Sequence, residues 1–258
     1  YYFYYLLINF KTSTMKKIGS LVSMMLLVFV SFSTRAQTAD EIISTYLKNI
    51  GGVEKFKSLT GTKTEMTVNY QGMEIPVELV QLKGGKMYLK INFQGQEITQ
   101  MAFDGTTAWS TNFMTMKAEK LESEMVQNIK DEANDFPDAM LDYKAKGYTA
   151  EYLGKETKEG TECHKIKLTK KPQTIDGQKV DNVVFYYFDT ENNVPILTET
   201  EVKSGPAKGQ ISTTTMSDYQ EVDGIFFPFS MNQGGQAMKI KKITLNPAVD
   251  QSAFAFKE

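Results

Sequence analysis

Stretches of alternating apolar and polar residues, separated by glycine-containing turns, constrain the fold of this chain more than any other feature. From residue 62 to residue 70, apolar or threonine side chains alternate with polar ones. This period of two is typical of a strand with one buried face. Gln71-Gly72, Gly84-Gly85, Gln94-Gly95 and Asp104-Gly105 punctuate the pattern. Because such turns join antiparallel strands, the sequence predicts a five-strand meander: Thr62–Tyr70, Met73–Leu82, Lys86–Phe93, Gln96–Phe103 and Thr107–Asn112.

The second half of the chain returns to the same pattern after an interruption at residues 117–147. Apolar and β-branched residues again recur with a period of two, between turn residues such as those of Asp189–Asn193. We expect seven strands: Tyr148–Lys155, Glu162–Lys170, Val180–Asp189, Pro195–Lys203, Gln210–Gln220, Ile225–Gln233 and Gln236–Asn246.

Helix signals occur before and between the two sets of strands. Thr38 and Glu41 have the spacing of a capping box, and the helix that follows should end at Gly51-Gly52, before a short second turn at Val53–Leu59. The stretch Lys117–Gly147 should hold two helices, because its apolar residues follow helical spacing. The first set is Leu121, Met125, Val126 and Ile129; the second, after Pro137, is Phe136, Met140, Leu141 and Tyr143.

These elements predict a mainly β fold of the α+β class in one domain, residues 37–258. A sheet of about 11–12 antiparallel strands must curl or close, because strongly twisted open sheets rarely exceed about ten strands. Helices with one apolar face would cover its concave apolar side. The expected architecture is therefore an incomplete barrel with a helical lid over an apolar cavity.

A secretory signal peptide is expected at residues 15–36. Met15-Lys16-Lys17 is its basic start, and Ile18–Phe32 is an apolar core of 15 residues, short for a membrane span; an uncleaved N-terminal anchor is the alternative. Small residues place cleavage near Ala36, and Gln37 follows where a lipoprotein has cysteine. We interpret residues 1–14 as an upstream extension. The protein should be exported to the periplasm and soluble after cleavage.

The charge of residues 37–258 argues against some classes of partner. They hold 25 basic and 31 acidic residues, and the only arginine of the chain, Arg35, lies in the expected leader. A net charge of about −6 argues against nucleic acid or an anionic membrane surface as the main partner. The only cysteine, Cys163, excludes an intramolecular disulfide and a cysteine-based metal cluster. A small buried residue is the favoured interpretation of Cys163, and a reactive thiol is the alternative.

No catalytic, cofactor or metal site is predicted. The only histidine, His164, follows Cys163 on an expected strand, so the two side chains should point to opposite faces. Motifs for nucleophilic serine, zinc or phosphate sites do not occur. Carboxylates such as Glu119, Glu122 and Glu124 lie beside lysines on faces that look exposed. We expect no enzyme, although a carboxylate pair that meets only in space stays an open alternative.

Methionine is the positive signal for binding. Residues 37–258 keep 11 methionines. Its flexible, polarisable side chain suits irregular ligands such as acyl chains, and filler in an ordinary core is the alternative interpretation. Several lie near aromatic residues in the expected strands or lid: Met87, Met101, Met114, Met116, Met125 and Met140.

Four stretches resemble one known family in their order along the chain. They are Asn49–Phe56 (NIGGVEKF), Phe103–Trp109 (FDGTTAW), Tyr219–Pro228 (YQEVDGIFFP) and Ile243–Asp250 (ITLNPAVD). With the leader, they make the chain similar to the LolA-like outer-membrane lipoprotein carriers of the lipoprotein-sorting family, particularly the divergent versions in Bacteroidetes-like bacteria.

The resemblance implies an incomplete antiparallel barrel covered by helices. It also implies a periplasmic carrier that binds the acyl chains of lipoproteins or lipids and shuttles them toward the outer membrane, in outer-membrane biogenesis. Its partners would be an inner-membrane donor and an outer-membrane acceptor. The alternative is an envelope-stress sensor or a hydrophobic-ligand-binding interaction domain of the same fold. The studied carriers couple lid closure to cargo through a cavity arginine, which residues 37–258 lack.

Nine residues are the candidates for the lining of the ligand cavity, and plain core is the alternative for each. They come from the third, fourth and fifth expected strands and from the expected lid. They are Met87, Leu89, Ile91, Phe93, Met101, Phe103, Trp109, Phe136 and Met140.

Overall fold

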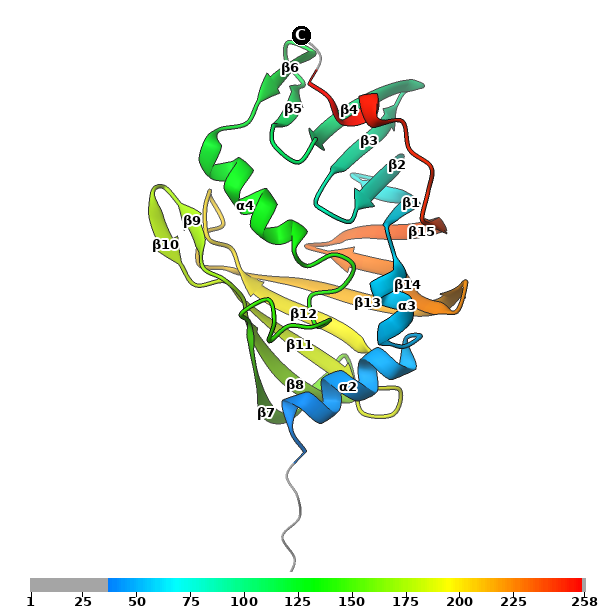
Figure 1. Ribbon diagram of the computed structural model, residues 1–258, viewed down its shortest axis with the longest axis vertical. Helices are drawn as coiled ribbons and strands as arrows, with labels where there is room; N and C mark the ends of the chain where they lie inside the picture. Colours follow the sequence, from blue (N-terminus) through cyan, green and yellow to red (C-terminus); the bar gives the residue numbers. More distant parts are fainter. Residues whose placement is uncertain (1–36, 257–258) are drawn as a thin grey trace, which may run out of the picture. The chain divides into compact units, whose positions relative to one another are not determined.

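A computed structural model describes residues 37–256, and the leader predicted at residues 1–36 lies outside the described residues. The described residues from Thr38 onward form a compact unit of their own. In the described part, thirteen antiparallel strands make one open, curled sheet in the order β6-β5-β4-β3-β2-β1-β15-β14-β13-β12-β11-β8-β7 (Figure 1). The mainly β, half-barrel fold class is therefore confirmed.

The strands of this sheet have the following bounds: β1 Gly61–Tyr70, β2 Met73–Leu82, β3 Met87–Phe93, β4 Gln96–Phe103, β5 Ala108–Asn112, β6 Lys117–Lys120, β7 Thr149–Lys158, β8 Thr161–Thr169, β11 Val183–Asp189, β12 Pro195–Glu201, β13 Ile211–Val222, β14 Ile225–Gln233 and β15 Gln236–Leu245. The helices are α2 (Ala39–Asn49), α3 (Val53–Ser58), α4 (Ser123–Ala133) and the short 3-10 helix η1 (Gln251–Phe254). A separate hairpin pairs β9 (Gln173–Ile175) with β10 (Gln178–Val180).

Local sequence explains the predicted meander. Tyr70 pairs with Met73 across the first turn, and both central residues have positive φ, 51° at Gln71 and 83° at Gly72. A two-residue turn with this geometry matches the twist of the strands that it joins. β1 to β5 follow one another along the chain and in the sheet, as predicted.

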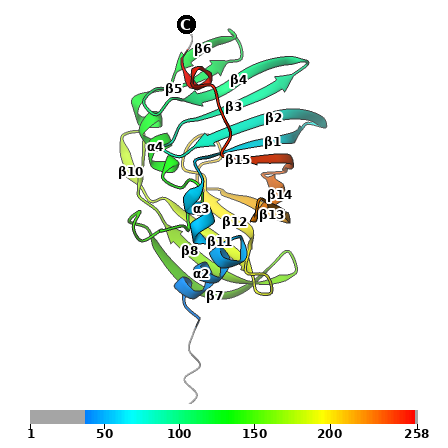
Figure 2. The same cartoon turned by 45° about the vertical axis from the view of Figure 1, so that its right-hand side comes forward.

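Helix α2 begins and ends as predicted. Thr38 Oγ1 accepts a hydrogen bond from the Glu41 amide at 3.2 Å, and Glu41 accepts one from the Thr38 amide at 2.9 Å. The helix packs its apolar side against one face of the sheet, which we call the inner face, in a core formed with Ile166, Leu168 and Phe188. Figure 2 shows α2 and α3 in front of the lower strands.

Gly51 brings the end of α2 against the turn between β13 and β14. The Phe226 amide donates a hydrogen bond to the Ile50 carbonyl at 2.9 Å. A Cβ atom at Gly51 would lie 2.4 Å from the Gly224 carbonyl oxygen, and Gly51 has a φ of 128°. Only glycine allows this approach without displacing the backbone.

Two smaller cores lie on the opposite, outer face. The C-terminal segment crosses β1 to β5 there (Figure 2) and buries Phe254 against Val80, Tyr88, Ala102 and Trp109. The other core joins Cys163, Tyr187 and Leu197.

The prediction of two helices at residues 117–147 is half wrong. The stretch contains strand β6 and one helix, α4, and then turns instead of a second helix at residues 136–143. Asp138 Oδ1 accepts a hydrogen bond from the Met140 amide at 2.7 Å, and Asp142 has a φ of 49°. Local aspartate bonding and left-handed backbone both compete with a helix.

The predicted strand Val180–Asp189 is also wrong at its start. Val180 ends β10, and β11 begins only at Val183. The missed signal is Asp176-Gly177, where φ values of 53° and 74° form the turn of the β9–β10 hairpin. With β6, the hairpin raises the strand number above the predicted 11–12.

Candidate functional site

Cross-strand pairing gathers apolar side chains on the inner face far from one another in sequence. Met216 pairs with Met231, Met231 with Met238, and Met238 with Val68. Farther along the sheet, Leu89 pairs with Met101. Paired residues point to the same face, so this ladder is continuous across β13, β14, β15 and β1.

Helices α2 and α3 cover one part of the inner face, and another part has few residues packed over it. Below α2 and α3, its residues belong to the main core. Over β1 to β4 and β13 to β15, eleven of its apolar side chains are half-buried and belong to none of the core clusters of the described residues. We call this second part the inner apolar surface: Met66, Val68, Leu79, Met87, Leu89, Ile91, Met101, Met216, Met231, Met238 and Ile240.

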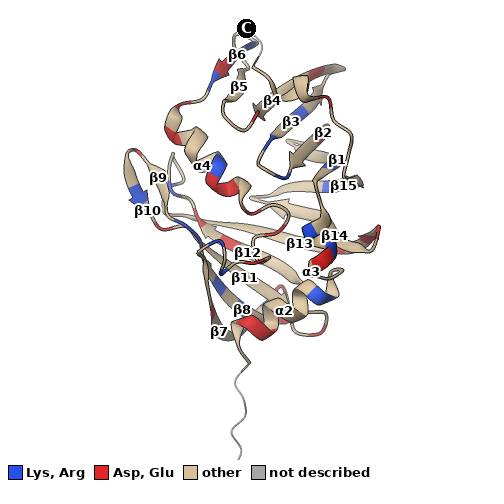
Figure 3. Cartoon of the chain, viewed as in Figure 1, with Lys and Arg blue, Asp and Glu red and all other residues tan. Residues whose placement is uncertain are grey.

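The inner apolar surface carries methionine and no ionisable group. Six of its eleven side chains are methionine. Its central strand β14 has no charged residue over its whole length (Figure 3). Soft apolar side chains without a charge can accept a flexible hydrocarbon and leave none of its polar atoms to be satisfied.

A pocket of about 160 Å³ opens between this surface and α4. Met87 and Met101 line it from the sheet, and Ile129, Ala133 and Phe136 line it from α4 and the residue stretch that follows. Pockets for drug-sized ligands measure roughly 300–1,000 Å³. This pocket alone is therefore too small to enclose a long acyl chain.

Helix α4 is bound to the β9–β10 hairpin by polar contacts. None of its residues is fully buried. The Asn128 side chain donates a hydrogen bond to the Thr174 carbonyl at 2.7 Å and accepts one from the Thr174 amide at 3.1 Å. Glu124 accepts bonds from the Asp176 and Gly177 amides at 2.9 and 2.8 Å. Weak apolar burial is the property of an element that can move at low cost.

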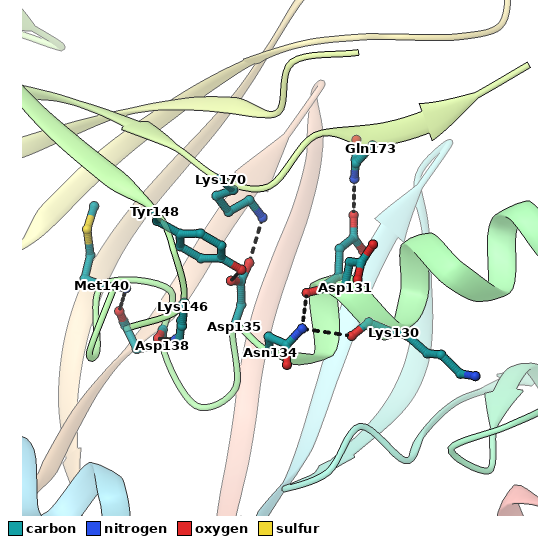
Figure 4. A network of polar contacts seen from close by, with 11 residues as sticks. Lys130, Asp131, Asn134, Asp135, Asp138, Met140, Lys146, Tyr148, Lys170 and Gln173 are labelled. Atoms are coloured by element: carbon teal, nitrogen blue, oxygen red, sulfur yellow. Dashed lines mark hydrogen bonds and ion pairs between the residues drawn. The ribbon is translucent and has the colours of Figure 1, made fainter. Parts of the chain in front are cut away.

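An ion pair fixes the chain directly after α4 (Figure 4). Lys170 Nζ lies 2.7 Å from Asp135 Oδ2, and the side chains are 12% and 22% exposed. The Tyr148 hydroxyl donates to Asp135 Oδ1 at 2.9 Å. This contact connects the C-terminal end of α4 to the residue that follows β8.

Asp138 holds the next part of the same segment. Its Oδ2 atom accepts a hydrogen bond from the Tyr46 hydroxyl of α2 at 2.7 Å, and its carbonyl accepts one from Lys146 Nζ at 2.7 Å. Burial raises the pKa of Asp138 and lowers the pKa of Lys146. The segment after α4 is therefore tied to α2 as well as to the sheet.

The structure brings some of the predicted lining residues together. Met87, Met101 and Phe136 share the pocket, and Leu89 and Ile91 continue the row of Met87 along β3. Phe93 ends that row, 37% exposed at the turn into β4. Phe103 lies on the inner face but is 1% exposed, and Met140 is fully enclosed in the main core.

Trp109 lies on the outer face, unlike the other predicted lining residues of the strands. It pairs with Ala102, whereas Met101 and Phe103 flank that residue on the inner face. Its indole nitrogen donates a hydrogen bond to the Phe254 carbonyl at 3.1 Å, and it packs in the outer core. A single step of strand register separates Trp109 from the inner apolar surface.

Sequence reasoning did not single out the methionines of the later strands. Met216, Met231 and Met238 come from β13, β14 and β15, and Met66 comes from β1. The period-two pattern placed each of them on one face of its strand. The order of the strands, which decides what that face meets, is a long-range property.

Cys163 and His164 point to opposite faces, as predicted. Cys163 is buried in the outer core, where burial raises the pKa of its thiol. The hydroxyl of Tyr152 lies 3.2 Å from His164 Nδ1 on the inner side. In residues 37–256, no group of three or more His, Cys, Asp or Glu side chains is arranged to hold a metal ion. Over the same residues, no helix has both the length and the apolar character to span a membrane.

Comparison with solved structures identifies the fold. No protein-family model and no curated protein matches the chain. The crystal structure of a LolA superfamily protein from Nitrosomonas europaea aligns at a TM-score of 0.52 and 13% identity, over 85% of this chain and 98% of that one. A domain from Vibrio parahaemolyticus, provisionally assigned as an outer-membrane lipoprotein-sorting protein domain, gives a TM-score of 0.48 and 12% identity over 83% and 94%. The chain has a divergent LolA-like fold, as its sequence resemblance predicted.

Proposed function

We propose that this protein is a periplasmic carrier that binds acyl chains of lipoproteins or lipids on its inner apolar surface and moves them toward the outer membrane. The observation that carries the proposal is the surface itself: a continuous, methionine-rich, uncharged area that the described residues leave outside every core cluster. A contiguous, half-buried apolar surface of this kind is typical of a ligand site.

Binding of this kind needs no catalytic group. Each methylene that leaves water contributes about 0.8 kcal/mol, so a chain that buries ten methylenes gains about 8 kcal/mol before the cost of its own ordering. We therefore propose a carrier and not an enzyme.

Loading requires α4 to leave the inner apolar surface. The pocket below it, about 160 Å³, admits only the end of a chain. Because polar contacts hold α4 to the β9–β10 hairpin, the two can move away from the sheet as one lid. Opening displaces residues 134–137 from the sheet and breaks the pair between Lys170 and Asp135.

In this proposal, Lys170 replaces the cavity arginine of the related carriers. Its ion pair with Asp135 favours the closed lid. A lysine makes a point-charge contact with one carboxylate oxygen and lacks the planar fork of arginine. The closed state is then held more weakly and responds more readily to cargo.

Export follows from the leader expected at residues 15–36, which would place the carrier between two membranes. Loading and release then require an inner-membrane donor and an outer-membrane acceptor.

A matched pair of variants on β14 tests the proposal. Met231 lies on the inner apolar surface, and Ser230, its neighbour, is also half-buried but lies on the outer face. With a fluorescent fatty acid as the probe, Met231→Gln should weaken binding about fivefold or more, because a polar amide replaces the thioether against the chain. Ser230→Gln should leave the dissociation constant within twofold. Equal effects of the two variants, or no probe binding by the unaltered protein, would contradict the proposal.

A further inference from the structure

Three hairpin turns lie at the same end of their strands. Successive turns of an antiparallel meander alternate between the two ends of its strands. The turns β1–β2 (Tyr70–Met73), β3–β4 (Phe93–Gln96) and β5–β6 (Asn112–Lys117) therefore lie on the same side, as Figure 2 shows for the first two at its right.

These turns carry a large share of the exposed apolar side chains. Of the ten large hydrophobic residues that are exposed in the described part of the chain, six lie on them. Single exposed hydrophobic residues are ordinary, but a group of them at one end of neighbouring strands indicates an interaction site. The six, with their exposed fractions, are Tyr70 (45%), Met73 (47%), Phe93 (37%), Phe113 (52%), Met114 (96%) and Met116 (48%).

In each turn, an asparagine side chain satisfies a backbone amide that would otherwise need water. An asparagine precedes or begins the turn and its side-chain oxygen accepts an amide of the turn: Asn69 from Gly72 at 3.1 Å, Asn92 from Gly95 at 3.0 Å, and Asn112 from Met114 at 2.9 Å. A donor already bonded within the turn costs less to remove from water. The residues between the strand ends, 71–72, 94–95 and 113–116, include no ionisable side chain.

The inner apolar surface extends to these turns. On β3 the inner row runs through Met87, Leu89 and Ile91 and ends at Phe93 in the turn. On β1 it runs through Met66 and Val68 and ends at Tyr70. An apolar path therefore connects the pocket under α4 with the exposed turns.

We propose that these three turns insert into the interfacial layer of a lipid bilayer with neutral headgroups, and that acyl chains pass between the bilayer and the inner apolar surface along β3. The proposal rests on the proposed function. Separate projecting side chains suit a fluid apolar layer, whereas a protein partner would need a matching pocket for each. Aromatic residues favour the bilayer interface. Turns without an ionisable residue between their strand ends, on a chain with excess acid, give little attraction to anionic lipid, so neutral headgroups are the fitting surface.

Vesicle flotation with residues 37–258 tests the insertion. The unaltered protein should float with phosphatidylcholine vesicles, and adding phosphatidylglycerol should not increase binding. Phe113→Asp and Met114→Asp should each lower the partition coefficient by about tenfold, since a charge replaces an inserted apolar group. Phe226→Asp is the matched control: Phe226 is 37% exposed beside another hairpin turn, at the end of α2. Its partition coefficient should stay within twofold of the unaltered protein.

A fluorescent fatty acid, added without vesicles, separates this proposal from the proposed function. Phe113→Asp and Met114→Asp should bind it like the unaltered protein, because neither residue belongs to the inner apolar surface. Probe binding without flotation, equal loss with Phe226→Asp, or flotation that depends on phosphatidylglycerol would overturn the insertion and leave the carrier function standing. Flotation through the turns without probe binding would support the insertion and contradict the carrier function.

Discussion

Replacing Lys170 with methionine should make the protein less stable and yet a tighter binder of acyl chains. The change keeps the length of the side chain and removes the charge that holds Asp135 after α4. Removing one partner of a fully buried pair costs about 3–5 kcal/mol, and exposed pairs contribute about 0–1 kcal/mol. With side chains 12% and 22% exposed, and with the Tyr148 hydroxyl still bonded to Asp135, we expect about 1.5 kcal/mol.

If this free energy is lost from the closed lid, the open population rises about tenfold, and the apparent dissociation constant falls by the same factor. Titration with a fluorescent fatty acid measures the affinity, and urea unfolding measures the stability. Lys144→Met is the control, because Lys144 pairs with Asp40 at 2.6 Å with 67% and 58% of the side chains exposed, away from the lid. It should change neither quantity. Unchanged or weaker probe binding by Lys170→Met, together with the loss of stability, would refute the lid argument.

Three further predictions concern the outer face, the end of α2 and the segment after α4. Trp109 fluorescence should not respond to acyl ligand but should shift to the red when residues 250–258 are deleted, because Phe254 covers the indole; a ligand-induced shift without deletion would contradict the placement. Gly51→Ala should lower the free energy of unfolding by about 3 kcal/mol or more, against about 1 kcal/mol for Gly52→Ala, since both have positive φ but only Gly51 lacks room for a Cβ atom; equal urea midpoints would refute the steric argument. Asp138→Asn should gain stability relative to the unaltered protein as pH rises from 4 to 8. The raised pKa of Asp138 means that its contribution is present below the ordinary carboxyl pKa and lost as pH rises through the folded-state value; a difference in melting temperature that is independent of pH would contradict it.

Local signals predicted most of the elements. The capping box of Thr38 and Glu41 and the two-residue turns of the first meander depend on neighbours a few positions apart, and both formed as expected. The errors lay where local signals compete. Apolar spacing after Pro137 favoured a helix, but the Asp138 side chain bonded to the Met140 amide. The prediction extended the apolar run 183–188 back to Val180, across the polar pair Asp181-Asn182, and so missed the break between β10 and β11.

The sequence predicted which residues of a strand share a face, but not which strands together form the candidate site. The row Met87, Leu89 and Ile91 follows from alternation alone. The methionines of β13 to β15 join it through the pairing of β15 with β1, two strands that are far apart in sequence. Trp109 was grouped with its neighbours because nothing local gives the face on which the C-terminal segment will pack. Face assignment across a turn requires the register, which is set by the whole sheet.

Native mass spectrometry of the protein purified from its own periplasm tests the carrier function most directly. If the protein is a carrier, a fraction of molecules should have the added mass of one lipid or lipidated species, and this mass should be lost in Met231→Gln but not in Ser230→Gln. A single mass equal to that of the polypeptide, in all three proteins and under conditions that preserve added complexes with a fatty acid, would contradict it.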